Sequence, residues 1–101
     1  MQIDHDGEKK DDPARSLTVP IRNNLVVVHL PHHAMQRMHQ RRVSDEDLVN
    51  CLKFPGIRNL PTEPGRKRIG RDDPYRHMRL DVVYEENADG SITVVSLFWV
   101  K

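Results

Sequence analysis

The chain has 101 residues, of which 37% are hydrophobic and 31% are charged. This length accommodates one small domain and excludes a multidomain enzyme or a nucleotide-binding sheet covered by helices on both faces. The net charge of +1 conceals an uneven distribution, because residues 1–16 carry −2, residues 17–101 carry +3, and residues 53–79 alone carry +5. Such a concentration is typical of proteins that bind phosphate-bearing partners, although a solvated basic face is the alternative.

We expect residues 1–16 to form a flexible acidic leader, because they are rich in charge and poor in apolar side chains, and residues 17–101 to form a single domain. A single cysteine, Cys51, excludes an internal disulfide and a four-thiolate zinc site. Its apolar neighbours predict a buried side chain rather than a nucleophile. The longest apolar run, residues 25–28, is far too short to span a membrane, and the acidic N-terminus is unlike a secretory signal. We therefore expect a cytoplasmic protein that does not bind membranes.

A turn at residues 23–24 and a β-branched strand at residues 25–30 come first, and Pro31 ends the strand. Residues 32–41 contain neither Gly nor Pro and repeat Ala and Met at helical spacing, which predicts a first helix.

The second helix has clear boundary signals. Ser44 is a favourable N-cap, Asp47 can return its hydrogen bond in a capping box, and Val43 and Leu48 stand where a hydrophobic staple would lie. We expect this helix to end before Pro55.

Extended segments fill the second half of the chain. Residues 57–60 and 66–70 are strand candidates, and residues 78–85 and 91–100 predict a hairpin. The last strand is apolar on both faces, so we place it near the centre of the sheet. This order predicts an α+β domain with two N-terminal helices packed on one face of a small antiparallel sheet.

One stripe of the first helix has the residues best suited to chemistry. His33, Arg37 and Arg41 are spaced i, i+4 and i+8, so three groups that can be cationic would repel one another along that stripe. An imidazole can move a proton near neutral pH, and a planar guanidinium matches phosphate oxygens. The stripe therefore indicates phosphoryl chemistry. The alternative is a surface helix whose arginines pair with carboxylates such as Asp81 or Glu85.

A second basic segment follows later in the chain. It could hold an RNA backbone, or it could be a charged edge strand that resists aggregation. Its members are Arg66, Lys67, Arg68 and Arg71. Four histidines are crowded between residues 29 and 39, but no carboxylate or thiolate stands among them, so we predict neither a metal nor any other cofactor.

The stripe and the residues that follow it resemble a known family. The matching residues are His33, Ala34, Arg37, Met38, Arg41, Val43 and Ser44, with Val94-Val95-Ser96-Leu97-Phe98 near the end of the chain. This pattern resembles a small bacterial family of unknown function that is grouped with RelE-like toxins and the wider barnase, EndoU and colicin ribonuclease fold. The resemblance covers about residues 27–100 and implies a RelE/barnase-like plan and RNA as substrate. Phe98 departs from the tyrosine that relatives tend to have, which leaves Ser96 as the nearby hydroxyl.

These observations together predict a metal-independent endoribonuclease of the toxin type. His33 would remove the proton from an RNA 2′-hydroxyl, Arg37 and Arg41 would stabilise the phosphate, and His77 could be a second proton-transfer group, with Ser96 as a secondary candidate. The expected partners are RNA and an antitoxin or immunity protein with an acidic surface. The protein would act in the bacterial cytoplasm or, as part of a secreted toxin, in a target cell. The alternative is a non-catalytic module of the same fold that binds RNA or protein.

Overall fold

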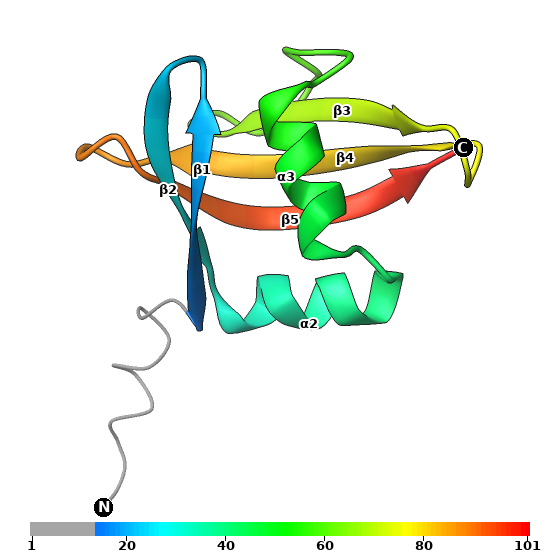
Figure 1. Cartoon of the computed structure of the whole chain (residues 1–101), viewed down its shortest axis with the longest axis horizontal. Helices are drawn as coiled ribbons and strands as arrows, with labels where there is room; N and C mark the ends of the chain where they lie inside the picture. Colours follow the sequence, from blue (N-terminus) through cyan, green and yellow to red (C-terminus); the bar gives the residue numbers. More distant parts are fainter. Residues whose placement is uncertain (1–13) are drawn as a thin grey trace, which may run out of the picture.

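A five-stranded sheet with two short helices makes up the fold (Figure 1). The computed structural model describes residues 14–101. In chain order the elements are β1 (Arg15–Ile21), β2 (Asn24–Leu30), α2 (His32–Arg41), α3 (Asp45–Lys53), β3 (Lys67–Asp73), β4 (Met78–Glu86) and β5 (Ile92–Val100).

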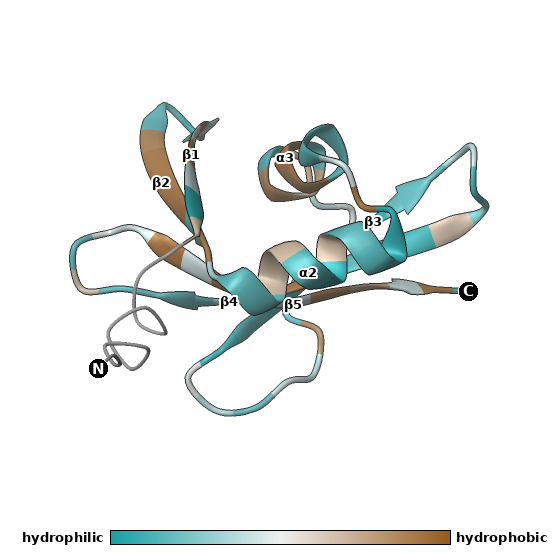
Figure 2. Cartoon of the chain, turned by 90° about the horizontal axis from the view of Figure 1, so that it is seen from below, coloured by the Kyte–Doolittle hydropathy of each residue, from teal (hydrophilic) through white to brown (hydrophobic). Residues whose placement is uncertain are grey.

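The sheet is mixed, with the strand order β1-β2-β5-β4-β3. Three of its four contacts between strands are antiparallel, whereas β2 and β5 are parallel. That parallel contact is short, because only Val28 and His29 pair with Ile92 and Thr93. The β1–β2 hairpin consequently rises away from the other three strands (Figure 2).

The helix boundaries follow the sequence signals closely. α2 begins after Pro31 and ends at Arg41, and the next residue, Arg42, adopts the left-handed conformation, so the predicted helix over residues 32–41 is confirmed. α3 begins with the predicted capping box, in which Ser44 and Asp47 exchange hydrogen bonds of 3.0 Å. Among residues 14–101, no helix is long and apolar enough to cross a membrane.

The hydrophobic core lies where the β1–β2 hairpin, α3 and the strands β3 to β5 meet. α3 crosses the face of these three strands, whereas α2 runs along the side of β5 (Figure 1). The fully buried aliphatic side chains at the centre are Val19, Val28, Leu30, Leu48, Val82, Val94 and Leu97. Burying such side chains supplies most of the stability of a domain of this size.

The predicted fold plan is wrong, although the domain is α+β overall. The structure is mostly β, its sheet is mixed rather than antiparallel, and the strand expected before the first helix is the second strand of a hairpin whose first strand, β1, was not predicted. The two helices do not share one sheet face, because α2 runs along the side of β5. The error has a physical source: β2 and β5 are about sixty residues apart in sequence, and two paired residues leave no local pattern that reveals their pairing.

The other sequence predictions are confirmed, shifted by one or two residues, or concern residues that the structure does not describe. The closing hairpin forms, and β5 occupies the centre of the sheet as expected. The turn of the first hairpin falls at residues 22–23 rather than 23–24. β1 begins at Arg15, so residues 15 and 16 of the expected leader belong to a strand, and residues 1–13 lie outside the described residues.

Candidate nucleic-acid interface

Two of the three stripe residues on α2 donate hydrogen bonds to the backbone of β5. Beyond Thr93, β5 has no strand partner on the side toward β2, so its backbone carbonyls there need other donors. The His33 ring donates from Nε2 to the Val95 carbonyl at 3.1 Å, and Arg41 Nη1 donates to the Leu97 carbonyl at 2.6 Å. We call the line of His33, Arg37 and Arg41 the α2 ridge. Its two ends, His33 and Arg41, are fixed in place by hydrogen bonds to backbone carbonyls of β5 that have no strand partner.

The hydrogen bond of His33 also determines its tautomer. A carbonyl oxygen only accepts, so Nε2 must carry the hydrogen, and in the neutral ring Nδ1 is then the nitrogen with a free lone pair. His33 is largely exposed at the first turn of α2. The ring is therefore oriented by the protein and keeps one basic nitrogen.

Arg37 is the member of the ridge that is open to a ligand. It is exposed and stands one helical turn from both His33 and Arg41, about 5–6 Å along the axis. Within residues 14–101 it forms no side-chain hydrogen bond and no ion pair, and the first turn of α2 has no acidic residue. Its guanidinium can therefore receive an anion, with the imidazole of His33 beside it.

His77 lies far from His33. It occupies the turn between β3 and β4, exposed, with a positive φ of 55°. The neighbouring Arg76 donates to the Arg42 carbonyl, which places this turn at the C-terminal end of α2, whereas His33 is at the N-terminal end. A helix of ten residues is about 15 Å long. The structure therefore does not bring the two imidazoles together.

Ser96 lies beside the ridge on the strand that the ridge contacts. It is half-buried between Val95 and Leu97, whose carbonyls accept from His33 and Arg41. It pairs in register with Val83 of β4, next to a bulge. The backbone of Ser96 therefore lies beside the ridge.

The basic residues of β3, and Arg66 just before it, are divided between the two faces of the sheet. Arg66 pairs with Glu63 and Glu85, and Arg68 donates to Asp81 at 2.8 Å on the face away from α3. Lys67 and Arg71 alternate with them and belong to the other face, where Arg71 donates to the Phe54 carbonyl at 2.9 Å. The four cations therefore do not form one continuous track for an RNA backbone.

The sequence reasoning missed a buried carboxylate between two arginines. Asp81 has no exposed surface, and its oxygens accept from Arg68 at 2.8 Å and from Arg79 at 2.6 and 3.0 Å. Gly70 lies opposite on β3, and the Arg68 guanidinium stacks 5.2 Å from the Phe98 ring. An acid within the apolar run of β4 is the sequence signal that could have revealed this cluster.

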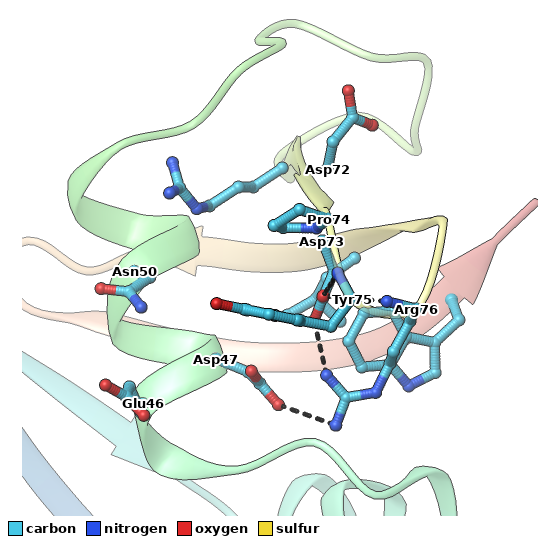
Figure 3. A pocket seen from close by; sticks show the side chains of 11 residues that line it. Glu46, Asp47, Asn50, Asp72, Asp73, Pro74, Tyr75 and Arg76 are labelled. Carbon is cyan, nitrogen blue, oxygen red and sulfur yellow. Dashed lines mark hydrogen bonds and ion pairs between the residues drawn. The ribbon is translucent and has the colours of Figure 1, made fainter.

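A pocket of about 290 Å³ at the α3 side of the β3–β4 turn contains acids and arginines that offset each other (Figure 3). Arg76 pairs with Asp73 and Asp47 and stacks 4.5 Å from the Trp99 ring, while Tyr75 is 91% exposed. Because Arg76 is neutralised by two carboxylates, and Glu46 and Asp72 also line the pocket beside Arg71, this pocket is a poor site for phosphate.

Cys51 is unsuited to catalysis. Its thiol donates to the Leu80 carbonyl at 3.6 Å, and burial, reinforced by the charge of Asp81 and opposed by Arg71, raises its pKa to about 12. At pH 7 only roughly one molecule in 10⁵ would carry the thiolate. Among residues 14–101, no three His, Cys, Asp or Glu side chains gather into a group that could hold a metal ion.

We therefore expect native Cys51 to resist thiol reagents. Ellman's reagent at pH 8 should leave it unmodified while the protein is folded and should modify one thiol per chain in guanidinium chloride. Stoichiometric labelling of a protein that keeps its native circular dichroism would contradict this assignment.

Comparison with family models identifies the part of the chain that contains the ridge. Residues 30–99 match a family described as a domain of unknown function, DUF4258. The chain belongs to this family. The DUF4258 segment includes α2, α3, β3, β4 and nearly all of β5, and it excludes β1 and all but the last residue of β2. The curated proteins and the solved structures gave no match.

Proposed function

We propose that this protein binds RNA along the α2 ridge and cleaves it without a metal ion. The observation that carries the proposal is the oriented imidazole of His33 beside the guanidinium of Arg37, which forms no ion pair with any of residues 14–101, on a helix without acidic side chains. An imidazole and a guanidinium side by side are suited to moving a proton and stabilising phosphate charge. The resemblance of the His33–Ser44 pattern to a bacterial family grouped with RelE-like toxins supports the same proposal.

The proposed reaction is an internal transfer of the RNA phosphate. His33 Nδ1 takes the proton of a 2′-hydroxyl, whose oxygen forms a bond to the adjacent phosphorus while the bond to the 5′-oxygen breaks. The 5′-oxygen leaves as a hydroxyl after taking a proton from water. The products are a 2′,3′-cyclic phosphate end and a 5′-hydroxyl end. Arg37 binds the phosphate oxygens as charge develops, and Arg41 holds α2 against β5.

The acidic partner predicted from the sequence belongs to this proposal. An antitoxin or immunity protein with carboxylates facing Arg37 would cover the ridge and exclude RNA from it. An antitoxin as partner would indicate action in the bacterial cytoplasm, whereas an immunity protein would indicate action in a target cell.

We expect the His33→Ala variant to lose RNA cleavage by at least a hundredfold, because general base catalysis contributes about 10² to 10⁴ in rate. Purified protein in EDTA would be incubated with total RNA, and the ends would be mapped for 2′,3′-cyclic phosphates. His39→Ala is the matched control, since His39 is exposed on the same helix but outside the ridge. Equal cleavage by wild type and His33→Ala, or no cleavage by wild type, would exclude this mechanism.

A second candidate function is a non-catalytic RNA-binding module. The separation of His33 from His77 favours it, because the expected second proton-transfer group does not lie beside the ridge. Under this alternative, Arg37→Ala weakens RNA binding and lowers the salt slope by roughly 0.7, one phosphate contact, while wild type produces no new RNA ends.

A further inference from the structure

A second cavity, of about 330 Å³, opens between the β1–β2 hairpin, the segment before β3 and the turn between β4 and β5. Its volume is at the lower end of the range for sites that hold small molecules. Apolar side chains from five different elements line it, namely Ile21, Val26, Leu52, Ile69 and Ile92, three of which are almost fully buried. The interior of this cavity is therefore apolar.

Four basic residues line the same cavity; Arg68 is paired with Asp81, and the other three come from three separate segments. Arg22 comes from the β1–β2 turn, Arg58 from the segment between α3 and β3, and Lys67 from the start of β3. All three are exposed, and within residues 14–101 none of them forms an ion pair. Glu86 is the acidic residue among the lining side chains. Cations gathered in this way repel one another unless an anion lies between them.

The backbone of the first turn supports a role for the Arg22 side chain. Arg22 and Asn23 have positive φ angles of 51° and 72°, the conformation of a two-residue hairpin turn that favours glycine and asparagine. An arginine is strained in this conformation, and strain of this kind concentrates at binding sites. The turn therefore holds a charged side chain at the cavity where a glycine would fit the backbone better.

Tyr84 adds an aromatic ring with a hydrogen-bond donor. It is half-buried in β4 and lines the cavity. Burial and the charge of Glu86 raise the pKa of its phenol, while Arg58 and Arg22 act in the opposite direction. The phenol is therefore a neutral donor at pH 7, suited to a phosphate or ribose oxygen, and its ring offers a face to a base.

We infer that this cavity binds a nucleotide, with the phosphate held by Arg22, Arg58 and Lys67 and the nucleoside placed against the apolar interior. The phosphate is the chemistry that both a free mononucleotide and the end of an RNA strand would present. No residue of the α2 ridge lines the cavity, so the inference does not depend on cleavage. Ile21, Arg22 and Val26 lie outside the DUF4258 segment, whereas the other residues that line the cavity lie within it.

Isothermal titration calorimetry of the full chain tests the inference with AMP and UMP as probes. We expect both to bind at least tenfold more tightly than adenosine or inorganic phosphate, because only the nucleotide uses the basic and the apolar groups together. A 5′-phosphorylated hexanucleotide and its 5′-hydroxyl counterpart separate the two sources of the phosphate. Preference for the phosphorylated strand over AMP identifies an RNA end, and the reverse identifies a free nucleotide.

Two variants locate the site. Arg58→Ala should weaken AMP binding about tenfold or more, which is the usual effect of losing a charge-assisted hydrogen bond. Arg22→Gly should weaken binding similarly without lowering the melting temperature, since glycine relieves the strained φ. Lys101→Ala removes one exposed charge elsewhere and should bind like wild type.

The inference fails if neither nucleotide binds, if inorganic phosphate binds as tightly as AMP, or if Arg58→Ala and Arg22→Gly both bind AMP like wild type. Because His33→Ala leaves the cavity intact, a failure of the proposed cleavage would leave AMP binding unchanged, and the two results are independent.

Discussion

Asp81→Ala should destabilise the protein by about 3 kcal/mol, one of the two largest effects that we expect from a single substitution. Removing one partner of a buried ion pair leaves the other charge without compensation, which costs about 3–5 kcal/mol. We take the lower figure because the side chains of Arg68 and Arg79 are 25% and 27% exposed and water can partly screen them. Chemical denaturation followed by circular dichroism measures the difference.

The matched control is Glu85→Gln on the same strand. Glu85 pairs with Arg66, but its side chain is 46% exposed, so the loss should be below about 1 kcal/mol. If Asp81→Ala cost no more than Glu85→Gln, the carboxylate would not be an essential part of the sheet, and the cluster would be free for another role.

The elements that local signals specify were predictable. The capping box of Ser44 and Asp47 located the start of α3, and the absence of Gly and Pro after Pro31 located α2 to the residue. β1 was missed because its sequence includes Pro20 and several polar residues, and its pairing with β2 is what makes it a strand. The parallel contact of β2 and β5 depends on distant segments, and no sequence period encodes it.

The candidate interface was predictable in part. Helical spacing correctly placed His33, Arg37 and Arg41 on one stripe, but only the exposed side of β5 explains why His33 and Arg41 are hydrogen-bonded to its backbone. The division of the β3 cations between two faces follows from the strand period of two, so the sequence already contained that information. The sequence does not reveal the cavity of Arg22, Arg58 and Lys67, because its cations come from three segments far apart in the chain.

Gly70→Ala should lower the free energy of unfolding by about 2–3 kcal/mol, because the added Cβ would collide with the Asp81 carboxylate and the Arg79 side chain. A Cβ on Gly70 would lie 2.6 Å from Asp81 Oδ1 and 2.9 Å from Arg79 Cδ and Nε. The φ of Gly70 is not positive, so alanine is otherwise acceptable in the strand and would even be favoured slightly. The whole penalty is therefore steric, and it is large because two guanidiniums hold the Asp81 carboxylate in place.

This origin can be separated from a general loss of packing by a double-mutant cycle. In the Asp81→Ala background the carboxylate is gone and Arg79 is free to move, so Gly70→Ala should cost less than about 1 kcal/mol, a coupling of at least 1 kcal/mol between the two positions. Gly56→Ala is the control, because its Cβ would meet only the Gly70 carbonyl at 3.7 Å, an ordinary contact. Additive free energies of unfolding for Gly70→Ala and Asp81→Ala would mean that the glycine and the carboxylate act independently, and the close packing of β3 against β4 would then need another explanation.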